Sequence, residues 1–76
     1  MNNTRRKAIR ELMESAETLK TDLEKIRDEE QEAFDNLPEG IQESERGEAM
    51  ESALNSLEEA LESFESALES MEEVVG

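Results

Sequence analysis

Residues 52–72 read SALNSLE, EALESFE and SALESME, three seven-residue units with almost the same pattern. Each unit has a leucine, a second large apolar residue three positions later, and an alanine just before the leucine. The three columns are Leu54, Leu61 and Leu68; Leu57, Phe64 and Met71; and Ala53, Ala60 and Ala67. Apolar residues that alternate at three and four positions form the seam between packed helices. The stretch predicts a long helix over 44–75, with the first two columns as its oligomer core.

The first half of the chain carries a second amphipathic pattern. Its apolar positions keep the three-four spacing apart from a gap at Glu30, and they are Ile9, Leu12, Ala16, Leu19, Leu23, Ile26, Ala33 and Leu37, with Met13 and Phe34 widening the stripe. Thr4 is the expected N-cap. Pro38 lacks an amide donor and restricts the residue before it, so the helix should stop by Asn36. The pattern predicts a first helix over 4–36.

The connection over 37–43 contains signals for a short helical turn. Asn36 and Glu39 have capping-box spacing, with Pro38 in the first turn. We expect the turn to run through Ile41, and we expect Leu37 and Ile41 to cover the end of the core. Ser44 is the expected N-cap of the second helix, because Glu45 and Glu48 follow in its first turn.

Two helices of nearly equal length with a short connection predict an antiparallel helical hairpin, an all-α fold with a single domain over 1–76. Charges agree with this pairing, because the hairpin brings the basic start of the first helix beside the acidic end of the second. These residues are Arg5, Arg6, Lys7 and Arg10, and Glu69, Glu72 and Glu73. The alanine column widens the apolar face beyond what one hairpin covers. We therefore expect self-association, most simply a homodimer that forms a four-helix bundle.

Composition narrows the classes of function. The 76 residues include 22 acidic and 8 basic ones, for a net charge of −14, and there is no Cys or His. Direct binding to nucleic acid or to an acidic membrane is not expected, because both require basic surfaces. The start of the chain has no apolar segment typical of a signal peptide. We expect a cytoplasmic protein without a cofactor.

An enzymatic function is not expected. Without histidine or cysteine, no Ser–His or Cys–His nucleophile and no four-helix di-iron site can be assembled. The cluster Glu58-Glu59-x-x-Glu62 with Glu69 and Glu72 is similar to magnesium sites of all-helical nucleotide pyrophosphohydrolases. Magnesium needs oxygen ligands that converge from more than one segment, whereas these carboxylates share one helix.

The glutamates of the second helix are candidates for partner binding, in particular Glu58, Glu62, Glu65 and Glu69. They recur in columns at seven-residue spacing. The simpler interpretation is a solvated face that keeps a bundle soluble. The functional interpretation is a surface that imitates the phosphates of DNA and occupies the basic groove of a DNA-binding enzyme.

Ser44-Glu45-Arg46-Gly47-Glu48 is the most distinctive local stretch. Arg46 is the only basic residue after Arg27, and the simpler interpretation pairs it with Glu43 or Glu48. Gly47 in a first helical turn costs about 1 kcal/mol relative to alanine, so close approach of another backbone or of a ligand would explain it. A binding site for a carboxylate or phosphate at Arg46, Gly47 and Glu48 is the alternative.

The segment 37–50, read as LPEGIQESERGEAM, resembles short acidic proteins of bacterial, phage and prophage genomes that share an L-P-E-x-[IL]-Q-x-S-E-R-G-E-x-M pattern. The likeness extends over about residues 22–74. It implies a small helical accessory protein of a phage or mobile element and supplies no catalytic residue. We therefore expect a non-enzymatic interaction module that binds a host protein through its acidic surface or its turn, and a basic host protein is a candidate partner. The alternatives are a DNA-mimicking inhibitor and a purely structural, self-assembling bundle.

Overall fold

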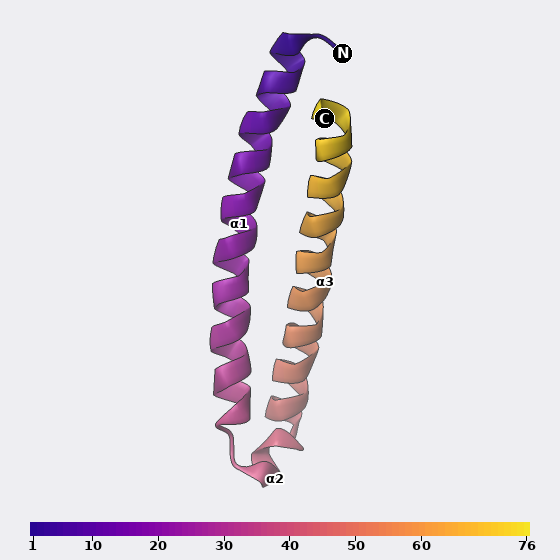
Figure 1. The fold of residues 1–76 in the computed structure, drawn as a ribbon. Coiled ribbons are helices and arrows are strands. Elements are labelled where there is room, and N and C mark those ends of the chain that lie inside the picture. The colour runs from indigo at the N-terminus through magenta and orange to yellow at the C-terminus, as the bar shows by residue number, and fades with distance from the viewer.

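The computed structural model describes residues 1–76, which form a helical hairpin. Helix accounts for 89% of the chain and there is no strand. Helix α1 covers Asn3–Asp35, the short helix α2 covers Glu39–Gln42, and helix α3 covers Glu45–Val75. Figure 1 shows α1 and α3 side by side in opposite directions, with α2 at the turn and both termini at the other end. The prediction of an all-α fold with two long helices in a hairpin is confirmed.

The first helix begins at a different cap from the one expected. Asn2 is the N-cap of α1, and its side-chain oxygen accepts a hydrogen bond of 2.8 Å from the amide of Arg5. The prediction of Thr4 was wrong because asparagine is at least as good a cap and comes first along the chain. The helix ends at Asp35 with Asn36 as its C-cap, before Pro38, as expected.

The turn is held together by Gln42, whose role the sequence did not reveal. Its side-chain nitrogen donates to the carbonyl oxygens of Phe34 at 3.1 Å and Leu37 at 3.3 Å. The Phe34 carbonyl belongs to the last turn of α1 and the Leu37 carbonyl to the connection after it, so the Gln42 side chain ties the end of α1 to the turn. The expected short helical turn is α2, although Pro38 rather than Asn36 is its N-cap.

The start of α3 follows the sequence closely. Ser44 is its N-cap: the hydroxyl oxygen accepts a hydrogen bond from the Gly47 amide at 3.4 Å and also donates to the Ile41 carbonyl. The expected cover over the end of the core is only half formed. Leu37 is half-buried, but Ile41 remains 40% exposed.

The core of the hairpin is one column of leucines on α3. Leu54, Leu61 and Leu68 are only 7%, 5% and 8% exposed, and they are the only buried hydrophobic residues. The half-buried residues of α1 are Arg6, Ile9, Met13, Ala16, Lys20, Leu23, Glu24, Arg27, Glu30 and Phe34, and most of them fall on the face turned toward α3. The aliphatic stems of Lys20 and Arg27 can pack on leucine while their charged ends reach solvent.

The covering face of α1 differs from the expected stripe. Leu12, Leu19 and Ile26 were expected in the seam, yet they are 60%, 57% and 54% exposed. The cause is that α1 carries two stripes that share Ile9, Ala16 and Leu23. One continues through Met13, Lys20, Arg27 and Phe34, and the other through Leu12, Leu19, Ile26 and Ala33. Helix α3 covers the first of them.

The hairpin is long and thin, with extents of 58 × 15 × 13 Å and a radius of gyration of 17.2 Å. A compact domain of this length would have a radius of gyration of about 11 Å. The accessible surface is 5699 Å², against about 4,700 Å² for a compact monomer of the same mass. The chain thus leaves about 1,000 Å² more surface in water than a compact fold would.

Candidate functional site

Two ion pairs join the long helices along one side of the hairpin. The Lys20 ammonium lies 3.3 Å from a carboxylate oxygen of Glu65, and the Arg27 guanidinium lies 2.6 Å from one of Glu58. The two pairs are spaced alike on both helices: Lys20 and Arg27 are seven positions apart on α1, and so are Glu58 and Glu65 on α3. The column of Glu58 and Glu65 was predicted from the sequence, but its pairing with Lys20 and Arg27 depends on the register of the hairpin.

Arg27 is the most strongly engaged charge in the molecule. The hydrogen bond to Glu58, followed by a second one to Asp28 at 2.8 Å, raises the pKa of its guanidinium. One nitrogen serves each carboxylate, so Arg27 connects a neighbour on its own helix to α3. The three charges hold the side chain across the interface while leaving it in contact with water.

The candidate glutamates of α3 divide into two groups. Glu58 and Glu65 are ion-paired with α1. Glu48, Glu62 and Glu69 are exposed, make no ion pair, and fall in one column at multiples of seven residues. We call the surface formed by Glu48, Glu62, Glu69 and the two interhelical ion pairs the acidic side. Three unpaired carboxylates of the acidic side are therefore free to meet a cation.

The opposite side of the hairpin is apolar. Ala16 and Leu23 on α1, and Leu54 and Leu61 on α3, lie on the faces that the two helices turn toward each other. Successive residues of an α-helix are about 100° apart around its axis. A residue four positions after one of these is therefore turned about 40° to one side, and a residue three positions after it about 60° to the other side. The ion-paired residues stand four positions after Ala16, Leu23, Leu54 and Leu61, and Leu19, Ile26, Leu57 and Phe64 stand three positions after the same residues. These large apolar residues therefore lie on the side opposite the ion pairs.

We call this surface the apolar side. On α1 it consists of Leu12, Leu19, Ile26 and Ala33, and on α3 of Leu57, Phe64 and Met71 with Ala53, Ala60, Ala67 and Val74. Leu57, Phe64 and Met71 are half-buried, and Val74 is 45% exposed. A shallow apolar depression of about 340 Å³ is lined by Ala60, Ser63, Phe64 and Ala67. Of the residues expected to form an oligomer core, Leu54, Leu61 and Leu68 instead face α1 within the hairpin.

Helix α3 carries its negative charge on one half of its circumference only. Its glutamates occupy three of the seven columns: Glu51, Glu58, Glu65 and Glu72; Glu48, Glu62 and Glu69; and Glu45, Glu59 and Glu73. A fourth outward column holds Ala49, Ser56, Ser63 and Ser70 and borders the alanines of the apolar side. The uncharged part of α3 is therefore wider than the face that α1 covers.

At the turn, Gly47 is explained by close packing of the chain on itself. It is buried, and a Cβ placed there would lie 2.6 Å from the carbonyl oxygen of Ile41 and closer still to that of Gln42. Of the two explanations considered for this glycine, approach of another backbone is the one observed, so we assign Gly47 to the turn and not to a binding surface. Arg46 is exposed and forms no ion pair with Glu43 or Glu48.

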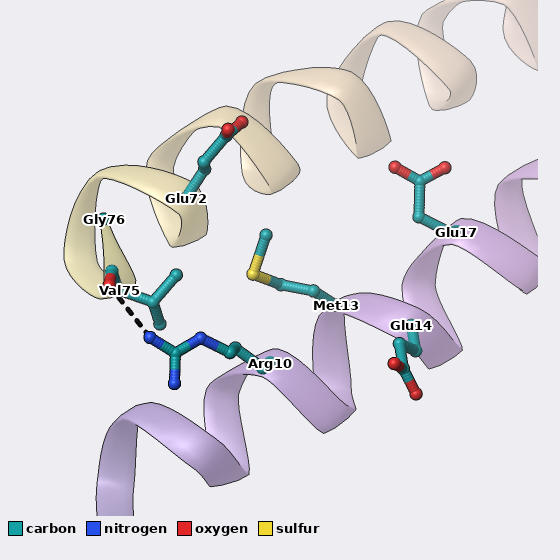
Figure 2. A pocket seen from close by; sticks show the side chains of 7 residues that line it. All are labelled: Arg10, Met13, Glu14, Glu17, Glu72, Val75 and Gly76. Carbon is teal, nitrogen blue, oxygen red and sulfur yellow. Dashed lines mark hydrogen bonds between the residues drawn. The ribbon is translucent and has the colours of Figure 1, made fainter. Parts of the chain in front are cut away.

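At the open end, Arg10 takes the place of the expected charge pairing. Its guanidinium donates a hydrogen bond of 3.3 Å to the carbonyl oxygen of Val75, which α3 itself leaves without a partner (Figure 2). None of Arg5, Arg6, Lys7 or Arg10 forms an ion pair with the acidic end of α3. The carboxylate of Glu72 points away from Arg10 in the same view. Cations near a helix C-terminus stabilise it through the helix dipole, so Arg10 fulfils that function.

The recess beside this contact is broad and open. Its volume is about 640 Å³, and it is lined by Arg10, Met13, Glu14, Glu17, Glu72, Val75 and Gly76. Only Met13 and Val75 supply apolar surface there. No group of three or more acidic side chains in the molecule is arranged to hold a metal ion. No helix combines the length and the apolar character needed to cross a membrane.

Comparison with known proteins gives no relative. The chain matches no protein family, no curated protein and no solved structure. The resemblance to short acidic phage and prophage proteins therefore stays a prediction.

Proposed function

We propose that this protein is a non-enzymatic interaction module that works as a homo-oligomer, with two hairpins joined through their apolar sides in a four-helix bundle. The observation that carries the proposal is the exposure of Leu12, Leu19 and Ile26 at 54–60% in a row beside the uncharged half of α3. Single exposed leucines are ordinary, but a contiguous apolar row marks an interaction surface.

The area available supports a partner of the size of a second hairpin. The surface in excess of a compact monomer is about 1,000 Å², and a stable interface buries about 800 Å² on each partner. Covering an aliphatic side chain fully contributes about 1.5–3 kcal/mol, and each residue of the row is still more than half exposed. A second copy presents the same chemistry, which is what a two-fold interface requires.

The mass of the assembly tests this proposal. We expect the wild-type chain to sediment as a dimer across a concentration series and Leu19→Glu to sediment as a monomer with its helicity retained. Thr21→Glu is the matched control, since it adds the same charge two residues away at an exposed position that the apolar side does not include. A monomeric wild-type chain, or a Leu19→Glu variant that stays dimeric, would contradict the proposal.

The acidic side supports a second function, the binding of a basic protein. Glu48, Glu62 and Glu69 are exposed and unpaired along one column, and the whole chain carries a net charge of −14. Such a field steers and binds cationic surfaces, and screening by salt weakens it. Salt separates the two functions, because it should strengthen the dimer by reducing repulsion between copies and weaken binding at the acidic side.

Neutralisation of the column tests this second function. A triple variant Glu48→Gln, Glu62→Gln and Glu69→Gln should lose partners captured from a bacterial lysate at low salt. A control with Glu11→Gln, Glu29→Gln and Glu32→Gln removes the same charge from exposed positions on α1 and should retain them. Displacement of the partner by duplex DNA would favour the DNA-mimic alternative. Equal loss in both triple variants would reduce the acidic side to a solubilising surface.

A further inference from the structure

Two hairpins that meet through their apolar sides can stack in two ways. Either α1 lies over α1 and α3 over α3, or each α1 lies over the α3 of the other copy. We infer that the second arrangement forms, with the two-fold axis parallel to the helices, so that Leu12, Leu19 and Ile26 of one copy pack on the column of Ala60, Ala67 and Val74 of the other. The inference rests on the proposed self-association and names its partner surface.

The distribution of charge between the helices favours this arrangement. Helix α1 has seven basic and ten acidic residues, a net charge of −3, whereas α3 has one basic and ten acidic residues, a net charge of −9. Stacking like on like would place the two most acidic helices against each other. Alternation gives each α3 only neighbours of low charge, one within the hairpin and one across the interface. Like charges placed opposite one another suppress a wrong pairing.

The sizes of the side chains favour it as well. The apolar row of α1 consists mainly of large residues, while α3 offers Ala53, Ala60 and Ala67 and the depression beside Phe64. Large side chains on one helix against small ones on the other allow close packing of the helix axes. With like on like, Leu19 would face another leucine row while the alanines faced each other across unfilled space.

The register of the hairpin brings these residues to the same height. Lys20 is level with Glu65 and Arg27 with Glu58. A two-fold axis parallel to the helices preserves height, so Leu19 of one copy comes within about a residue of Ala67 of the other, a rise of about 1.5 Å. Ile26 meets Ala60 in the same way, and Leu12 meets Val74. All three large residues of α1 therefore find a member of one column of α3.

The uncharged outward column of α3 has a role in this arrangement. Asp22 and Glu29 stand three residues after Leu19 and Ile26, on the far side of the apolar row from α3 of the same copy. In the alternating bundle they border Ser56, Ser63 and Ser70 of the other copy. A glutamate in that column would oppose these acidic residues across the interface, whereas a serine adds no charge. The absence of charge in this column is thus accounted for.

Engineered cysteines distinguish the two arrangements, and the chain has no cysteine of its own. Leu19 is the midpoint of α1, Asn3–Asp35, so full overlap of α1 on α1 would place Leu19 of one copy beside Leu19 of the other. Leu19→Cys alone would then form a homodisulfide. In the alternating bundle it cannot, but an equimolar mixture refolded with isotope-labelled Ala67→Cys forms a heterodisulfide, because the two Cβ atoms approach disulfide distance.

We expect the heterodisulfide of Leu19→Cys with Ala67→Cys to exceed either homodisulfide by about tenfold in mild oxidation followed by mass spectrometry, since proximity raises the effective concentration. Thr21→Cys mixed with Ala67→Cys is the control and should not cross-link. Dominant Leu19→Cys homodisulfide, or a dimer by mass without the heterodisulfide, would overturn the arrangement while leaving self-association standing. A wild-type chain that is monomeric by sedimentation would overturn both.

Discussion

Two rows of large apolar residues have the same seven-residue spacing, yet one row is buried and the other is exposed. On α3, Leu54, Leu61 and Leu68 are 5–8% exposed, whereas on α1 Leu12, Leu19 and Ile26 are 54–60% exposed. This difference in exposure depends on which stripe of α1 is turned toward α3. The row on α3 faces the only other helix of its length, and α1 meets it with the stripe that contains Lys20 and Arg27.

Heptad spacing predicts that a stripe will be covered but not by which surface. Helix α1 has two stripes and one intramolecular partner, so one stripe must be left over. The stripe turned toward α3 contains the residues that make ion pairs with Glu58 and Glu65. The more apolar stripe is the one that stays exposed.

The largest effect separates the two rows directly. Leu61→Ala removes a residue that is 5% exposed and should lower the free energy of unfolding by about 2–5 kcal/mol. Leu19→Ala should cost less than about 1 kcal/mol in the monomer, because that side chain is already mostly in water. Urea unfolding followed by circular dichroism, at a protein concentration at which the chain sediments as a monomer, measures both losses. Equal losses would mean that the two rows are covered alike.

A second prediction concerns Gly47, which stands in the same column of α3 as the buried leucines. Gly47 precedes Leu54 by seven residues and is packed against the carbonyls of Ile41 and Gln42. Gly47→Ala should destabilise by about 1–3 kcal/mol through overpacking, despite the better helix propensity of alanine. Gly40→Ala is the control: nothing lies within 4 Å of its Cβ, so it should stabilise by up to about 1 kcal/mol. The same unfolding assay decides, and a stabilising Gly47→Ala would show that the turn can relax.

Much of the fold could be predicted from the sequence because its signals are local. Pro38 fixes where α1 stops, Ser44 caps α3, and the columns of residues 52–72 define the helix that carries the core. The start of α1 was missed because two adequate caps stand close together. Gln42 was missed because its two hydrogen bonds depend on where the turn places it, and no local pattern encodes that.

The candidate site was only partly predictable for a similar reason. The sequence identifies the glutamate columns, but only the register of the hairpin shows that Glu58 and Glu65 are paired while Glu62 and Glu69 are not. Likewise, the spacing of apolar residues is compatible with either Leu12 or Met13 in the seam. The stripe of Met13 is the one that α3 covers, and two turns further along it holds Lys20, whose partner Glu65 is far away in the chain.

A smaller effect tests whether the ion pairs stabilise the hairpin or select its face. Lys20→Leu removes a surface ion pair, which is worth about 0.2–1 kcal/mol, and adds a half-buried apolar side chain that offsets the loss. Glu65 stays solvated because its side chain is 60% exposed. We expect the free energy of unfolding to change by less than about 1 kcal/mol. A loss of more than about 2 kcal/mol would mean that the pair holds the helices together and does more than orient them.

The last prediction is that the contribution of the Arg27 contacts to stability does not depend on pH near neutrality. The bonds to Glu58 and Asp28 raise the pKa of Arg27 in the folded state above its ordinary value. A raised pKa contributes stability at every pH below the unfolded value and loses it only as the pH rises through the folded value. For an arginine that window lies in strong alkali. The difference in unfolding free energy between the wild type and Arg27→Gln should therefore stay constant from neutral pH to about pH 10. If this free-energy difference shrinks within that range, the Arg27–Glu58 pair is coupled to another titrating group. The acidic side and the apolar side would then differ in their response to pH as well as in polarity.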